Sequence, residues 1–421
     1  MKKRICSVVL SVILSTVALI SIAYGSVEEV LTLDQCIAVA LEHNPLVLSS
    51  REQYRASLAR IHQARALFMP SLDFDSDLQP SFFNFGDSAE SYVGLSLPLE
   101  FPGKRQVRGK IAAKESQELL AEIDLLKLDI TLQVKQAFYG LLLAQEKIKY
   151  AEQNLELAKD FLDKAELKFT AGDVARVEVL RARVEASKAA NETRIAKNEE
   201  KLARAMLNFL LARKKYEPLA ITGELKRQPL ILELEGLKGR AFAFRPEIKR
   251  LSHALDRESL IRTQGYMSYL PDFDIGLSRH RLQGEKTTWD FTLSFPIPLF
   301  FWQPKKGEIA EASANIEALK RDQQHLQNTI GLEVEEAYLN AVTAENQIEL
   351  FEKEILTQAE EVYKMFLFSY QEGEISGIEL IEARRTLIEA RRSYADALFN
   401  YDITLAVLEK SIGQNLEGEQ K

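Results

Sequence analysis

The chain has 421 residues, a formal net charge of −8 and 28% charged residues. Its basic residues do not gather on one stretch or face, which argues against a nucleic-acid partner. Its two cysteines are Cys6 and Cys36, and the first lies in a segment expected to be removed, so no internal disulfide is expected.

Residues 1–25 have the pattern of a secretory signal peptide. A basic start and an apolar run over 5–20 precede Ala23 and Gly25, the small residues that predict cleavage before Ser26. A membrane anchor is the alternative, but the polar, charged chain directly after the run favours a signal. Cleavage leaves a net charge of −11. Because Cys6 lies too early for lipid attachment, an exported chain without a lipid anchor is expected.

Two parts of the chain repeat one pattern at an offset of 201 positions. The stretch TAGDVARVEVLRARVEA from Thr170 matches QEGEISGIELIEARRTLIEA from Gln371, and Pro70 matches Pro271. Such self-similarity predicts a duplicated architecture. The expected divisions are a first repeat over 26–213, a connector over 214–236, a second repeat over 237–412 and a tail over 413–421.

Each repeat is expected to hold a helix, a β-hairpin and a long helical hairpin, in that order. In the first repeat these are a helix over 45–69, a β-hairpin over 72–99 and helices over 104–168 and 174–213. In the second they are a helix over 246–270, a β-hairpin over 272–297 and helices over 305–370 and 374–412. The two shorter helices of a repeat together match the length of its long helix, which suggests a wall of constant height.

A seven-residue pattern supports the long helices. Large residues recur at Val134, Leu141, Ile148, Leu155, Leu162 and Phe169, and alanines recur three positions later at Ala137, Ala144, Ala151, Ala158 and Ala165. A strict heptad predicts left-handed supercoiling, and alanine in the seam lets helix axes approach closely. Antiparallel helical hairpins are therefore expected.

The expected strands alternate apolar and polar residues, as membrane strands do. The polar face would carry the acids Asp73, Asp75, Asp77, Asp272, Asp274 and Asp290. Aromatic residues bracket the strands, as at membrane interfaces. The alternative is a soluble protein with two hairpins packed on a helical bundle. Four strands are too few for a membrane barrel, which needs about eight, so three copies with twelve strands are expected.

This order of elements resembles that of the TolC-type outer-membrane efflux channels. The resemblance covers 31–412 and includes the proline-led strands and the aromatic-x-x-Gly, Glu, Ala pattern of the two matching stretches. It implies an α+β membrane protein in which a trimeric twelve-stranded β-barrel continues into a periplasmic helical coiled-coil barrel. It also implies a homotrimer in the outer membrane that works with a periplasmic adaptor and an inner-membrane RND-type pump.

The family resemblance also assigns roles to the helical tips. Adaptor docking would involve Phe169, Gly172, Asp173, Leu180, Ala182, Gly373, Glu374, Ile381 and Ala383. The pore gate would consist of Tyr370, a hydrogen-bonded Glu178, and the constriction acids Glu379 and Glu382. The alternative is a solvated helix face on which Glu382 pairs with Arg385. The family's arginine after the second tip glycine is replaced here by Ile375.

The junctions between strands and helices resemble those of the heavy-metal branch of the family. They read LPLEFPGKRQVRGK from Leu97 and FPIPLFFWQPKKGE from Phe295. A passive exit duct for metal cations is therefore expected. The alternatives are a duct for drugs, organic solutes or secreted proteins, and an envelope scaffold without a pore.

No enzyme, bound metal or cofactor is expected. The five histidines are scattered, and none stands at ligand spacing from another histidine or a cysteine. No grouping of serine, histidine and aspartate suggests nucleophilic catalysis, and no glycine-rich phosphate loop is present.

Overall fold

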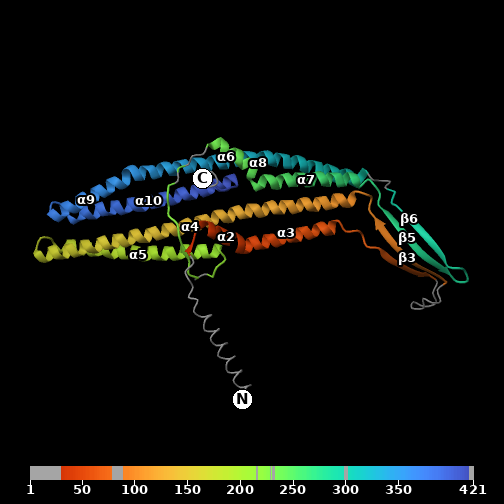
Figure 1. Ribbon diagram of the computed structural model, residues 1–421, viewed down its shortest axis with the longest axis horizontal. Helices are drawn as coiled ribbons and strands as arrows, with labels where there is room; N and C mark the ends of the chain where they lie inside the picture. Colours follow the sequence, from red (N-terminus) through yellow and green to blue (C-terminus); the bar gives the residue numbers. More distant parts are fainter. Residues whose placement is uncertain are drawn as a thin grey trace, which may run out of the picture.

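The computed structural model of the chain describes residues 30–77, 89–214, 217–227, 229, 233–297 and 302–416. The signal peptide expected over 1–25 lies outside these residues, as do the aromatics Phe82, Phe83, Phe85, Phe300 and Phe301. The molecule is elongated, with a β-sheet at one end and two helical hairpin tips at the other (Figure 1).

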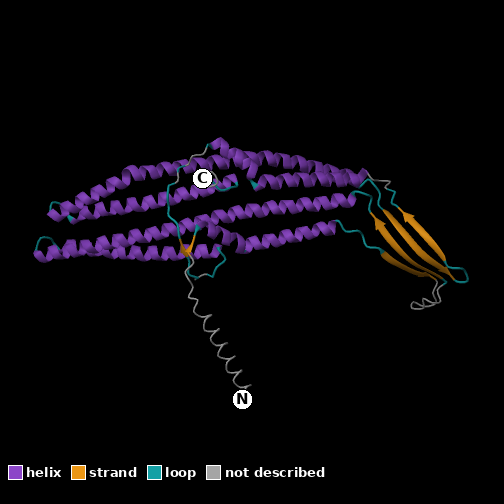
Figure 2. Cartoon of the chain, in the orientation of Figure 1, coloured by secondary structure: helices purple, strands orange, loops and turns teal. Residues whose placement is uncertain are grey.

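The elements follow one order twice. Figure 2 shows that helices make up the long body and that the strands of the larger sheet lie at one end of it. The first half consists of β1 (Val30–Leu31), α2 (Leu33–His43), α3 (Pro45–Ala64), β2 (Ser71–Asp77), β3 (Glu90–Leu99), α4 (Lys104–Ala171) and α5 (Arg176–Leu210). After β4 (Ala220–Ile221), the second half consists of α6 (Leu234–Phe244), α7 (Pro246–Met267), β5 (Phe273–Leu282), β6 (Thr288–Ser294), α8 (Trp302–Leu350), η2 (Phe351–Ile355), α9 (Leu356–Glu372) and α10 (Gly377–Ile412).

Helices α2 and α6 were missed by the sequence analysis. Thr32 caps α2 through a reciprocal capping box with Gln35, whose side-chain oxygen accepts the Thr32 backbone N–H at 2.8 Å. A threonine followed three residues later by glutamine is a helix-start signal that could have revealed α2. For α6 the structure records no side-chain cap, so no comparable signal was available.

The expected equality of helix lengths is wrong. Helix α3 has 20 residues and α5 has 35, against 68 in α4. The helix expected over 45–69 ends at Ala64, where Arg108 of α4 donates from Nε to the Ala64 carbonyl at 2.6 Å and satisfies one of the carbonyls that a helix end leaves free. The backbone between Ala64 and Ser71 then leads to β2 without helix.

The alanine line of the heptad lies in the interface between helices. Ala151, Ala158 and Ala165 are buried, together with Val134 and Leu141. The large residues further toward the tip are only half-buried, and Phe169 is exposed. The seam therefore closes on its alanine side, where small side chains let α4 and α5 approach each other.

The second long helix is interrupted where the first is continuous. A π-helical turn, η2, separates α8 from α9. Arg227 from the connector contacts Glu345, Glu349 and Glu352 beside this turn, at 3.2, 3.4 and 3.7 Å. The connector is thereby held against the helix at the place where the helical hydrogen bonding changes.

The four long strands form one antiparallel sheet in the order β2-β3-β5-β6. The central pair, β3 and β5, comes from different halves of the chain and joins them. A separate small sheet pairs β1 with β4 in parallel. The edge strands β2 and β6 each have one partner among the described strands.

Candidate functional site

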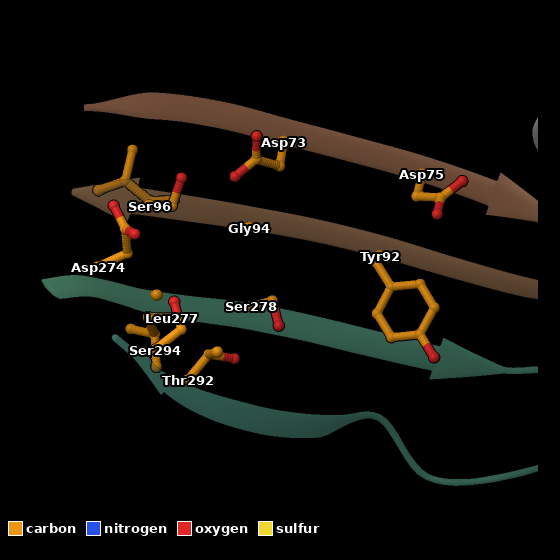
Figure 3. A pocket seen from close by; sticks show the side chains of 12 residues that line it. Asp73, Asp75, Tyr92, Gly94, Ser96, Asp274, Leu277, Ser278, Thr292 and Ser294 are labelled. Atoms are coloured by element: carbon orange, nitrogen blue, oxygen red, sulfur yellow. The ribbon is translucent and has the colours of Figure 1, made fainter. Parts of the chain in front are cut away.

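One face of the four-stranded sheet is polar and acidic. Strand register places Asp73 beside Gly94 and Asp75 beside Tyr92 in the pair β2 and β3. On the same face, in the pair β5 and β6, it places Ser278 beside Asp290. Figure 3 shows side chains of this face, including Asp73, Asp75 and Tyr92. They line a hollow of about 420 Å³. A water-filled passage bounded by this face would favour cations, because the face carries several carboxylates.

Five of the six acids expected on this face share it: Asp73, Asp75, Asp77, Asp274 and Asp290. For the sixth, Asp272, a place on this face stays a prediction. This residue lies one residue before β5, where its Oδ1 accepts hydrogen bonds from Lys104 Nζ and from the Phe101 backbone N–H, both at 2.8 Å. Asp272 therefore ties the sheet to the start of α4.

Glu90 belongs to the same polar face and was missed. Its Oε1 accepts the Tyr92 hydroxyl at 2.5 Å and lies 2.8 Å from Nε2 of His280. The Tyr92 and His280 rings are stacked, with centroids 4.2 Å apart. The alternation of β3 could have revealed Glu90, which lies two and four positions before Tyr92 and Gly94 on the same face.

The opposite face of the sheet is apolar and exposed. Its exposed members are Leu72, Phe74, Val93, Leu95, Leu277, Trp289, Phe291 and Leu293. So large a group of uncovered apolar side chains indicates a surface that contacts lipid or protein.

The conspicuous junction motif builds the connection between sheet and helices. Arg108 pairs with Glu100 at the end of β3, and its guanidinium lies 5.6 Å from the Phe68 ring centroid. In the second half, Lys305 donates to the Ser268 carbonyl and lies 5.8 Å from the Tyr269 ring centroid. These residues therefore position the helices relative to the sheet. This structural role does not indicate which cargo passes through the protein.

The two tips have the same backbone geometry. Gly172 and Gly373 have φ values of 89° and 81°, in the left-handed region that favours glycine. Asp173 and Glu374 follow them outside the helices, and the helix starts expected at 174 and 374 are too early, because α5 begins at 176 and α10 at 377. The acids in the first turns of these helices are instead Glu178 and Glu379.

A small apolar core lies directly behind the tips. It contains Phe161, Ala165, Val179, Ala182, Tyr370, Leu380 and Ile381. Of the residues expected to dock an adaptor, Ala182, Ile381 and Ala383 are buried, so their side chains are not available at the surface of this conformation. Those at the surface are Phe169, Gly172, Asp173, Leu180, Gly373 and Glu374.

The expected hydrogen bond between Tyr370 and Glu178 is absent from the described structure. The Tyr370 hydroxyl and Glu178 Oε2 are both buried without a hydrogen-bond partner among the described residues. Burial raises the pKa of Tyr370, and the nearby Glu178 carboxylate raises it further. Tyr370 is only 3% exposed and packs on Phe161, with ring centroids 5.5 Å apart, while Lys168 Nζ lies 4.4 Å from its ring.

The two expected constriction acids have local partners. Glu379 Oε2 accepts the Ser376 backbone N–H at 2.8 Å and closes a capping box at the start of α10. Glu382 pairs with Arg385 at 3.0 Å, as the solvated-face alternative anticipated. Arg385 also contacts Glu185 of the other hairpin at 2.7 Å, a link between the halves that the sequence analysis missed.

Among the described residues, no group of three or more histidine, cysteine, aspartate or glutamate side chains is arranged to hold a metal ion. None of the described helices has a stretch both long and apolar enough to cross a membrane.

The chain matches the family model described as outer membrane efflux protein over residues 36–213 and 239–414. It belongs to the outer membrane efflux protein family. This confirms the resemblance found in the sequence, and the family is one of efflux proteins rather than enzymes.

Relatives and solved structures agree with this membership. The chain is 24% identical over 384 residues to the cobalt-zinc-cadmium resistance protein CzcC of Cupriavidus metallidurans, covering 87% of this chain and 86% of that protein. It is 22% identical over 421 residues to the outer membrane protein TolC of Escherichia coli, covering 93% of this chain and 84% of that protein.

The fold is similar to that of CusC, a protein whose structures concern folding and transmembrane channel formation. The TM-score is 0.76 at 17% identity, covering 91% of this chain and 92% of CusC.

Proposed function

We propose that this chain is one third of a trimeric outer-membrane channel, the passive exit duct of a tripartite efflux system. In the trimer, three four-stranded sheets close a twelve-stranded barrel, and the helices continue as a periplasmic tunnel. The observation that carries the proposal is the two-faced sheet, acidic on one face, apolar and exposed on the other, with edges at β2 and β6 that have no further partner among the described strands. When β2 of one copy pairs with β6 of the next, no strand edge is left open.

The helices offer complementary edges for the same ring. Exposed apolar residues recur every seven positions on α5, at Ile195, Leu202 and Phe209, and on α8, at Leu332 and Leu339. Helices α3 and α5 lie along one long edge of the helical body, and α8 and α9 along the other (Figure 1). Contact between unlike edges is head-to-tail and closes into a ring when the rotation permits.

Metal cations are the proposed cargo. Support comes from the likeness to a cobalt-zinc-cadmium resistance protein over most of the chain and from the carboxylates of the polar sheet face. Those carboxylates would line the barrel and concentrate cations at its wall. The likeness to TolC keeps a duct for organic solutes as the second candidate.

The tips form the proposed gate and adaptor-docking surface. The exposed side chains of Phe169 and Leu180 would contact a periplasmic adaptor, which works together with an inner-membrane pump. Tyr370 supports a role in closing the pore, because its hydroxyl and the nearby Glu178 Oε2 are both buried without a hydrogen-bond partner among the described residues, and a hydrogen bond between them would remove that cost in free energy. Tyr370→Phe should then raise the basal conductance, and an unchanged conductance would remove Tyr370 from the gate.

Planar-bilayer conductance of the detergent-purified protein tests the proposal. A cation-selective conductance is expected, and Asp73→Asn, Asp75→Asn and Asp77→Asn together should lower the cation-to-anion permeability ratio by about twofold or more. The matched control is Asp272→Asn, which removes an acid engaged at the helix junction and should leave the ratio unchanged. A soluble elongated monomer would point to the scaffold instead. Equal permeation of metal cations and organic cations would favour the organic-solute duct.

A further inference from the structure

The charges of the sheet are sorted by face. Every acid of the described strands lies on the polar face, whereas the two arginines of these strands, Arg279 and Arg281, lie on the apolar one. Register places Arg279 beside Val93 and Trp289, and Arg281 beside Ser91. Both arginine side chains are exposed. Among the strands that the structure describes, no acid shares the face on which they lie.

Neither guanidinium has a partner among the residues that the structure describes. Arg108 and Arg245, by contrast, pair with carboxylates at the helix junctions. An arginine that is free, exposed and surrounded by apolar side chains differs from the structural arginines of this chain. Its guanidinium is available to an anion from outside the chain.

The two arginines mark the end of the apolar face that is far from the helices. Along β5, Phe273, Ile275 and Leu277 occupy the apolar face first, and the arginines follow at the next two positions of that face. Trp289, which is 67% exposed, stands beside Arg279. Tryptophan with arginine beyond an apolar band is typical of a membrane interface, because arginine is costly in the hydrocarbon core and tolerated near headgroups.

We propose that Arg279 and Arg281 bind the phosphate of an anionic lipid headgroup in the leaflet far from the helices. The inference rests on the proposed channel function, since it requires the sheet to lie in a bilayer. Guanidinium groups bind phosphate oxygens in a bidentate manner. Residues two apart on one strand face are about 7 Å apart, which lets both arginines reach one phosphorylated headgroup.

A lipid fits this surface better than free phosphate does. The acyl chains of a bound lipid would lie along Leu277 and Phe291, which are exposed on the same face next to the arginines. Free phosphate would gain nothing from these apolar neighbours. The arginines and the apolar rows thus recognise the two parts of one molecule.

Native mass spectrometry of the detergent-purified trimer tests the inference. The probes are phosphatidic acid and digalactosyl diacylglycerol with the same acyl chains, the second of which has no phosphate. Phosphatidic acid should bind about tenfold more tightly than the glycolipid, and Arg279→Gln with Arg281→Gln should abolish this preference. Arg279→Lys with Arg281→Lys should retain part of it, because lysine keeps the charge without the bidentate geometry.

The matched control is Arg181→Gln with Arg194→Gln on α5, two exposed arginines far from the sheet, which should leave the preference intact. An unchanged preference in the sheet variant, with normal conductance, would overturn the lipid site and leave the channel standing. Displacement of phosphatidic acid by millimolar inorganic phosphate would overturn the lipid assignment in favour of a phosphate site. Failure of the wild-type protein to enter bilayers would overturn both the channel and this inference.

Discussion

Asn44 and Arg245 occupy corresponding places in the two halves, 201 positions apart, and both satisfy the end of a neighbouring helix. Asn44 Nδ2 donates to the Leu210 carbonyl at 3.3 Å, and Arg245 Nη1 donates to the Ser411 carbonyl at 3.1 Å. A buried carbonyl at a helix end needs a donor, but the donor can be an amide or a guanidinium. Both halves therefore need a hydrogen-bond donor at this place, and each half supplies it with a different residue.

The exchange has a consequence for stability. Asn44 is neutral, whereas Arg245 carries a buried charge that engages Glu247 at 2.5 Å and Glu333 at 2.7 Å. Two carboxylates depend on one guanidinium in the second half, and none depends on the amide in the first. The second half should be the more sensitive to substitution at this position.

Replacing these two residues should give the largest difference between the halves. Arg245→Ala should lower the free energy of unfolding by about 3–5 kcal/mol, because it leaves carboxylates without their buried partner. Asn44→Ala should cost about 1–3 kcal/mol, since it removes hydrogen bonds to buried backbone groups. Thermal melting followed by circular dichroism at fixed protein concentration measures both. Equal effects would show that the ion pairs of Arg245 add nothing to the hydrogen bond.

The two halves also differ at position 402, where the stability of the second half should depend on pH. Burial raises the pKa of Asp402 to about 7, and its Oδ2 has no hydrogen-bond partner among the described residues. An unfolded aspartate titrates near pH 3.9. The contribution of Asp402 to the stability of the folded state is therefore fully present below about pH 4. Its stability should fall by up to about 1.4 kcal/mol per pH unit as the pH rises toward 7.

Denaturation of wild-type and Asp402→Asn protein between pH 4 and 8 checks this dependence, which the variant should lose. The counterpart in the first half is Lys201, which is exposed, and Lys201→Gln should leave the pH profile as it is. A wild-type stability that is flat over this range would contradict the assignment to Asp402.

The tip glycines should behave alike in both halves. Gly172→Ala and Gly373→Ala should each cost about 1–2 kcal/mol, because an L-residue is strained in the left-handed conformation. The structure places no heavy atom within 4 Å of a Cβ added at either position, so the cost is one of backbone conformation.

Gly140→Ala and Gly331→Ala are matched controls for the tip variants. Both glycines lie inside long helices with open space around them, and both substitutions should stabilise by about 0.5–1 kcal/mol. Chemical denaturation of the four variants shows whether each substitution raises or lowers the free energy of unfolding. A tip variant as stable as the wild type would show that the turn adapts to alanine.

The smallest effect is expected at the starts of the returning helices. Ser376 caps α10 with Glu379, whereas Ala175, its counterpart, gives α5 no side-chain cap. Ala175→Ser should therefore stabilise by about 0.5–1 kcal/mol, and Ser376→Ala should destabilise by about 1 kcal/mol. The denaturation midpoints of the two variants, each compared with that of the wild type, measure these effects. Loss of stability in Ala175→Ser would show that Glu178 is held elsewhere.

The long helices differ in a way that the repeat pattern could not reveal. Helix α4 is continuous, and its counterpart changes to a π-helical turn at η2, where Tyr394 donates its hydroxyl to Glu352 at 2.9 Å. Sequence periodicity indicates a helix in both cases, because one extra residue in a turn alters the pattern little.

Sequence patterns alone predict the order of elements, the tip turns, the two-faced strands and the family. These follow from glycine positions, heptads and alternation, which act between residues close together in the chain. Five of the six expected sheet acids share one face for the same reason.

Which of the polar residues have a hydrogen-bond or ion-pair partner depends on how the chain packs. Asp272 pairs with Lys104, and Glu379 accepts the Ser376 backbone N–H, while Tyr370 and Glu178 lie buried without the hydrogen bond expected between them. Such pairings depend on side chains brought together from separate elements or on the detailed geometry of a helix start. A pattern of residue types fixes where a carboxylate stands along an element, and packing fixes which partner neutralises it.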